Sequence, residues 1–153
     1  MSDHSDLLKR FADLQKETIS GCEAFTRQAA AAADFPYWTN ALGPGEFELD
    51  GDEQAIEVRR VLSRLIIGHV TQDYNGEVED DLYEQVSIWH QAIADAPQLI
   101  GTTNTTAPTY LHALGVWLES DTGLEFFLTP GVGAVQIGIE FTHICHLFEA
   151  INT

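Results

Sequence analysis

The stretch that decides the fold is VQIGIEFTHICHLF, residues 135–148, because its side chains alternate in character almost without a break. Successive side chains of a β-strand point to opposite faces of the sheet, so this alternation predicts a long strand. One face is predicted to hold Val135, Ile137, Ile139, Phe141, His143, Cys145 and Leu147. The opposite face is predicted to hold Gln136, Gly138, Glu140, Thr142, Ile144 and His146.

Turn signals precede this strand. YLHALGVWLES and GLEFFLT flank Asp121-Thr122-Gly123, and their composition and spacing predict a β-hairpin. TPGVGA, residues 129–134, predicts a further turn directly before the long strand.

Two earlier segments also predict strands. Residues 55–72 are rich in Ile, Val and Leu, and alternation places Val61 and Leu65 on one face. A shorter strand is predicted around Tyr37–Leu42. Gly43-Pro44-Gly45 and Asp50-Gly51-Asp52 predict a loop after it.

Two segments have helical periodicity. Between residues 3 and 33, apolar side chains recur at three- and four-residue steps from Leu7 to Ala29. Residues 77–95 repeat this pattern, and Pro97 follows them. The sequence therefore predicts a long N-terminal helix over about residues 1–33 and a second, central helix.

The predicted order of elements is α-β-β-α-β-β-β, with hairpins that favour antiparallel pairing. This order predicts an α+β fold in which a mostly antiparallel sheet is backed by both helices. A chain of 153 residues is predicted to form one domain, residues 1–153, with the sheet and central helix in residues 34–153.

Charge is distributed unevenly along the chain. Residues 1–64 hold 12 acids and all 7 bases, whereas residues 65–153 hold 12 acids and neither Lys nor Arg. Such a surface repels phosphate, which argues against electrostatic binding of nucleic acid or of an anionic membrane. The remaining explanations are solubility, adaptation to high salt, or a surface that stays near nucleic acid without binding it.

Glu77, Glu79, Asp80 and Asp81 begin the central helix, where the helix dipole favours anions. We interpret them as an acidic surface that faces solvent or DNA. The dipole does not explain why the end of the same helix lacks Lys and Arg.

Two patterns suggest metal sites, and we favour neither. His143 and His146 would point to opposite faces of a strand, so they cannot share one ion. The ligand positions of a calcium loop are matched by Asp73, Asn75, Glu77, Glu79, Asp81 and Glu84, but Val78 stands where that loop requires glycine. Cys22 and Cys145 fit no metal spacing. We expect no metal and no cofactor.

Catalytic motifs are also missing from the sequence. It contains no G-x-S-x-G elbow, and its glycine-rich stretches lack the lysine of a P-loop. A pair of carboxylates acting as general acid and base stays an open alternative, because a chain with 24 acidic residues always contains candidate pairs. We therefore expect a protein that assembles or binds rather than an enzyme. The alternatives are a small acidic cytoplasmic binding or regulatory domain and a carboxylate-using enzyme.

Three stretches carry a resemblance to a known family: RVLSRLIIGHV, then NGEVEDDLYEQV opening a helix, then GLEFFLTPGVGAVQIGIEFTHICHLFEAIN closing the chain. Over about residues 34–150, the order of the predicted elements and the character of these stretches resemble the tail terminator, or tail-completion, proteins of long-tailed bacteriophages. The N-terminal helix is longer than that pattern requires.

The resemblance implies a structural protein of the virion tail or neck, assembled in the host cytoplasm. Its subunits would form a ring, commonly a hexamer, that caps the tail tube and joins it to the head-side connector. Contractile tails would add the sheath protein as a partner. DNA would pass through the ring without specific binding, and no membrane would be involved. Arg59, Arg60 and Arg64 would then meet acidic neighbours at subunit contacts.

Overall fold

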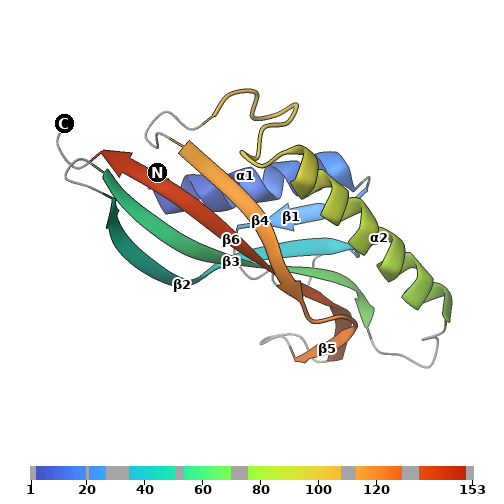
Figure 1. Ribbon diagram of the computed structural model, residues 1–153. Helices are drawn as coiled ribbons and strands as arrows, with labels where there is room; N and C mark the ends of the chain where they lie inside the picture. The colour runs from blue at the N-terminus through green and yellow to red at the C-terminus, as the bar shows by residue number, and fades with distance from the viewer. Residues whose placement is uncertain are drawn as a thin grey trace.

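The strand predicted from alternation is β6, Val135–Ala150, which pairs with β3, β4 and β5 (Figure 1). The computed structural model of the chain describes residues 3–19, 21–26, 35–50, 54–69, 76–107, 113–128 and 135–150. The other elements are α1 (Asp3–Thr18), β1 (Glu23–Phe25), β2 (Tyr37–Asp50), β3 (Gln54–His69), α2 (Gly76–Asp95), β4 (Ala113–Asp121) and β5 (Glu125–Leu128).

The six strands form one sheet in the order β1-β2-β3-β6-β4, and β5 also pairs with β6. Every pairing is antiparallel except that of β1 with β2. The predicted α+β class, with an N-terminal helix and a central helix backing a mostly antiparallel sheet, is therefore confirmed.

The N-terminal helix is shorter than predicted. α1 ends at Thr18, and Gly21 adopts a left-handed conformation with φ of 79°. Glycine reaches that conformation without steric cost, which suits it to the end of a helix. Cys22, which belongs to the apolar stripe, is buried directly before β1, and Ala24 is buried within β1, so burial at Cys22 does not require a helix. The prediction of a single helix is thus wrong at residue 19 and over residues 21–26, whereas residues 20 and 27–34 lie outside the described part.

β2 is longer than predicted and includes Gly43 and Gly45, which suggested a loop, whereas Gly51 lies outside the described residues. Its register against β3 shifts between Leu42 and Gly45, so Gly43 and Pro44 form an irregularity within a strand. Bulges of this kind absorb extra residues while pairing continues on both sides. The predicted strand over 55–72 corresponds to β3.

The predicted hairpin around Asp121-Thr122-Gly123 is wrong. β4 and β5 do not pair with each other; each pairs with β6, β4 opposite residues 141–148 and β5 opposite residues 135–138. They are successive parts of one edge. Between them the backbone of Thr122 still donates to the Glu140 carbonyl over 3.0 Å. The predicted turn at residues 129–134 lies outside the described residues.

The main core lies between the sheet and both helices. Leu7 and Phe11 of α1 and Leu82 and Trp89 of α2 pack in one buried cluster with the sheet. The predicted apolar face of β6 is turned toward this cluster and is buried except at Val135, which is 36% exposed.

One stretch of β6 is buried on both faces. Gln136 is buried beside a second, smaller cluster that contains Tyr37, Ile66 and Phe127, and the Tyr37 hydroxyl donates to Gln136 over 3.0 Å. A Cβ at Gly138 would collide with the Leu65 carbonyl of β3, so glycine is needed for this close approach.

Candidate assembly interface

One face of the sheet faces away from both helices, and no helix among the described residues covers it (Figure 1). We call it the open face. Strand register assigns to it Thr39, Ala41, Val58, Arg60, Leu62, Arg64, Gly115, Trp117, Ser120, Glu140, Thr142, Ile144 and His146. Glu119, at a register shift of β4, reaches this face through its ion pair with Arg60. This face is the candidate functional surface, because a sheet face that remains uncovered is available to a partner.

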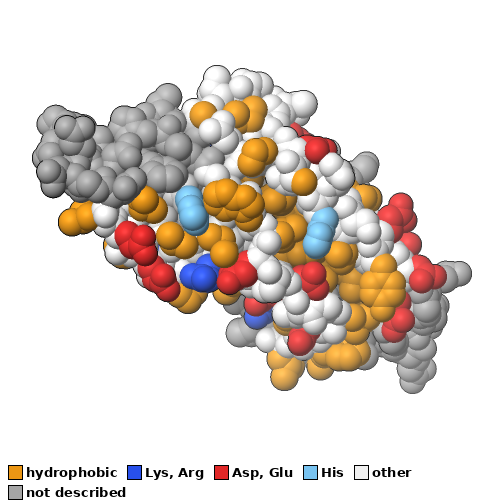
Figure 2. Space-filling model, viewed as in Figure 1, with side chains coloured by type: hydrophobic (Ala, Val, Ile, Leu, Met, Phe, Trp, Pro, Cys, Tyr) orange, Lys and Arg blue, Asp and Glu red, His pale blue; other side chains and the backbone are white. Residues whose placement is uncertain are grey.

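The open face is partly apolar. Trp117 is 51% exposed, and its ring lies edge-on against His146 with centroids 4.7 Å apart. Leu62 and Ile144 are half-buried. Figure 2 shows hydrophobic side chains grouped beside a few charged ones on the molecule's surface. A grouped apolar surface with a polar border is typical of protein contact sites.

Two ion pairs cross the open face. Arg60 donates to Glu119 over 3.0 Å, and Arg64 donates to Glu140 over 2.6 Å. Glu119 raises the pKa of Arg60 through this hydrogen bond and its charge. Each arginine is therefore held in place and partly neutralised within the chain.

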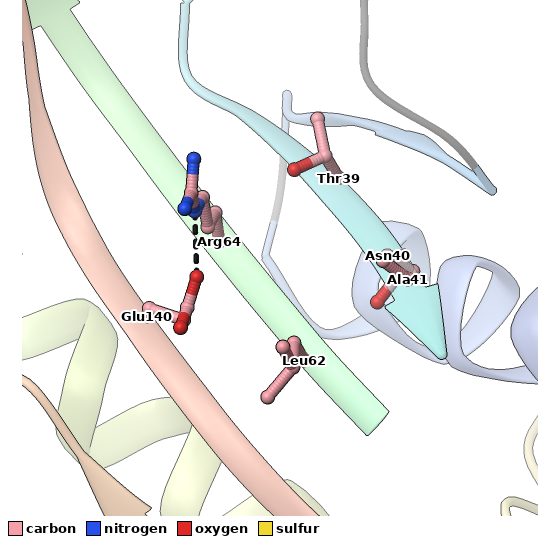
Figure 3. Close-up of a pocket in the computed structure, with 6 residues that line it drawn as sticks. All are labelled: Thr39, Asn40, Ala41, Leu62, Arg64 and Glu140. Carbon is pink, nitrogen blue, oxygen red and sulfur yellow. Dashed lines mark hydrogen bonds and ion pairs between the residues drawn. The ribbon is translucent and has the colours of Figure 1, made fainter. Parts of the chain in front are cut away.

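Arg64 and Glu140 border a shallow hollow on the open face, with a volume of about 160 Å³ (Figure 3). Thr39 and Leu62 line the same hollow. The Arg64 guanidinium also lies 4.4 Å from the centre of the Phe127 ring, close enough for a cation–π contact. The hollow is small and open, so it suits one side chain of a protein partner better than an enclosed substrate.

The three arginines predicted at subunit contacts do not form one cluster. Arg60 and Arg64 lie on the open face, whereas Arg59 lies on the helix face. There Arg59 donates to Glu57 over 3.0 Å and to the Gly43 carbonyl over 3.1 Å. Adjacent positions on a strand point to opposite faces, which separates Arg59 from Arg60.

The predicted acidic residues lie at the start of α2, away from these arginines. Asp80 and Asp81 are exposed and Glu79 is half-buried, while the side chain of Glu77 lies outside the described part. α2 has no basic residue in its last turn.

The residues that the structure describes give no support to a metal site at His143 and His146 or at the calcium-like stretch. Those residues contain no group of three or more His, Cys, Asp and Glu side chains able to hold an ion. His143 and His146 do lie on opposite faces of β6, as predicted. The first residues of the calcium-like stretch, 73–75, are outside the described ranges.

His143 is part of the core. Its Nε2 accepts a hydrogen bond from the Trp89 indole over 2.9 Å, and its Nδ1 lies 3.1 Å from the Val61 carbonyl. Burial lowers the pKa of His143 to about 4. The ring is therefore neutral, donating from Nδ1 and accepting at Nε2. This arrangement uses both nitrogens, so His143 has a structural role.

The sequence analysis missed a second buried polar group. The amides of Gln15 and Asn40 exchange hydrogen bonds of 2.9 and 2.8 Å, and Ser63 donates to Asn40 over 2.6 Å. Asn40 also donates to the Phe25 carbonyl, which ties α1 to β1, β2 and β3. The one available signal was a glutamine and an asparagine among apolar positions.

No protein-family model matches this chain, and a comparison with curated proteins finds no match. Within the described residues, neither helix combines the length and the apolar character needed to cross a bilayer.

Proposed function

We propose that this protein is a structural subunit of a bacteriophage tail, namely a ring-forming tail terminator. The ring would cap the tail tube, stop its growth and join it to the head-side connector, with the sheath protein as a further partner in contractile tails. In this proposal the subunit is not an enzyme.

The open face is the observation that carries the proposal. A sheet with both helices on one side leaves an apolar and charged surface to be covered, and a binding partner is the simplest cover. We assign this face to the tail tube or the connector. Its arginines are already paired with acids, so contact there would depend mainly on Trp117, Leu62 and Ile144.

Charge gives separate support. DNA must pass through such a ring, and Lys or Arg on the lumen would bind phosphate and release counterions. A chain without a base after Arg64 can line a passage with α2 and the strands that follow it without retaining DNA.

The test is assembly on tail tubes. The purified protein is mixed with polymerising tail-tube protein of its own virus and viewed by electron microscopy. We expect rings at tube ends and tubes that stop lengthening. A stable monomer or dimer that never associates with tubes would contradict the proposal and leave the acidic binding domain as the better explanation.

A further inference from the structure

A groove lies along the edge of the sheet that β4 forms. α2 and β4 lie side by side (Figure 1). His90, Ile93 and Ala94 of α2 line one wall of the groove, and Val116 and Leu118 of β4 line the other. Ile93 and Val116 are buried and supply its apolar part, whereas His90 and Ala94 are exposed. The groove has a volume of about 250 Å³, which suits one bulky apolar side chain better than a whole small-molecule ligand.

The outer edge of β4 offers backbone groups to a further strand. The Val116 N–H donates to the Pro97 carbonyl over 2.8 Å, so the backbone of Val116 points away from β6. Backbone groups alternate in direction along a strand, so the N–H and C=O of Leu118 also point outward. No strand among the described residues lies beyond β4 in the sheet. An extended segment can therefore pair with β4 over a short length, which ends at the register shift after Leu118.

Charge determines which kind of segment fits this groove. Residues 65–153 include neither Lys nor Arg, so neither wall carries a permanent positive charge. At one end the Asp121 carboxylate lies 3.8 Å from the His90 imidazole, and near the other end Asp95 follows Ala94 in α2. Both acids belong to exposed residues. A Lys or Arg at each end of the segment would meet one of these acids, whereas an acidic segment would be repelled.

A second copy of the chain does not meet this requirement with its described residues. There, Lys and Arg belong to α1 and β3. α1 is a helix, and β3 is paired on both sides within the sheet, so neither provides a free extended segment. The part of β2 beyond its pairing with β1 carries Glu46 and Glu48, which the acids of the groove would repel.

We propose that the α2–β4 groove binds an extended, cationic segment of a partner protein. The segment adds a short strand to β4, inserts one apolar side chain between α2 and β4, and places a Lys or Arg beside Asp121 and Asp95. This inference goes beyond the proposed function, because it concerns the edge of the sheet and not the open face, and its test does not depend on tail tubes.

Short probe peptides test the proposal. The peptide Lys-Thr-Phe-Thr-Lys, capped at both ends, has its Phe and both Lys side chains on one side when extended, as the groove requires. It is titrated into the isotope-labelled protein, and backbone amide shifts are followed by NMR. We expect saturable shifts at Leu118 and Ala94, with a Kd in the millimolar range or below.

Two control peptides separate the contributions of charge and of the apolar side chain. Glu-Thr-Phe-Thr-Glu reverses the charges, and Lys-Thr-Ala-Thr-Lys removes the bulky side chain. Each should bind at least about tenfold more weakly than the first peptide. Equal binding by the Glu peptide, or shifts from the first peptide only at other parts of the surface, would overturn the proposal.

Variants of the protein locate the binding. Ala94→Trp fills the groove and should abolish the shifts at Leu118. Ala41→Trp is the matched control, because Ala41 is an exposed alanine on the open face, and it should bind the peptide as wild type does. Asp95→Asn/Asp121→Asn leaves the groove open and should weaken binding of the Lys peptide by about tenfold.

Two results with these variants would overturn the proposal. One is binding of the Lys peptide with wild-type affinity by both Ala94→Trp and Asp95→Asn/Asp121→Asn. The other is self-association of wild type that Ala94→Trp abolishes and Ala41→Trp retains, because a second copy would then be the occupant of the groove.

Discussion

The indole of Trp89 on α2 donates a hydrogen bond to the imidazole of His143 on β6 over 2.9 Å. The bond joins α2 to β6 inside the main core. It requires a neutral histidine, because a protonated ring has no acceptor nitrogen. The pairing of helix and sheet is thereby made sensitive to acid.

We expect acid to weaken the fold through His143. Its folded pKa is about 4, below the ordinary value of 6.5, so the unfolded chain binds more protons between these values. The contribution of His143 is complete above pH 6.5 and declines as pH falls toward 4. By pH 5 about 2 kcal/mol of unfolding free energy is lost. Denaturant titrations at pH 7 and pH 5 measure this loss.

The control is His143→Gln, which removes the titrating ring. The variant should be less stable than wild type at pH 7, and the gap should narrow by pH 5. His146→Gln, on the open face, should keep the pH dependence of wild type. A constant gap between wild type and His143→Gln would show that His143 does not cause the acid sensitivity.

Asn40→Ala should be strongly destabilising. It leaves the Gln15 amide, the Ser63 hydroxyl and the Phe25 carbonyl without the partner they share in the core. Each unsatisfied buried group costs about 1–3 kcal/mol, so we expect a loss of about 3 kcal/mol or more. Thermal and denaturant unfolding measure it. Thr39→Ala, the neighbouring position on the open face, should cost much less; equal losses would contradict the importance of the network.

The long strand was predictable because its signal is local and repeated. Burial alternates at each position from Ile139 to Leu147, and the side covered by the helices is the apolar one. The helix boundary at Thr18 was not predictable from periodicity, since Cys22, a position of the apolar helical stripe, is also buried where the chain enters β1. Burial alone does not distinguish the two structures.

The turns show a different limit. Asp121-Thr122-Gly123 has the composition of a hairpin turn, but composition does not determine which strands pair. Here β4 and β5 both pair with β6, so Asp121-Thr122-Gly123 only separates two successive strands on one edge of the sheet. The site has this limit too: alternation separates Arg59 from Arg60, but only the positions of both helices decide which face stays open.

Leu62→Gln should separate folding from binding. Leu62 is half-buried on the open face and borders the hollow beside Arg64, so a polar side chain of similar size should cost about 1 kcal/mol or less. Under the proposed function the variant should bind tail tubes at least tenfold more weakly, as measured by co-sedimentation. Leu128→Gln is the matched control on β5 and should bind as wild type does. If Leu62→Gln binds tail tubes as wild type does, the open face is not the surface that contacts the tube.

The acids at the start of α2 should be dispensable for folding. Replacing Glu77, Glu79, Asp80 and Asp81 by Gln or Asn should cost at most about 1–3 kcal/mol in lost dipole interactions. Excess calcium should leave the melting temperature of wild type unchanged, because a ligand stabilises only a protein that binds it. A rise of several degrees would show that the calcium-like stretch is a metal site.

Replacing the same four acids by Lys tests whether their role is to repel DNA. Lysines at these four positions would release counterions from phosphate, so we expect nonspecific DNA binding that weakens steeply between low and physiological salt. Binding is measured by fluorescence anisotropy with a short duplex at several salt concentrations. The Gln/Asn variant is the control, since it removes the negative charge without adding a base, and it should bind far less. In virions, the Lys variant should still assemble tails but package or release DNA poorly. If it ignores DNA and instead abolishes oligomerisation, these acids lie at a contact between subunits and do not face the lumen.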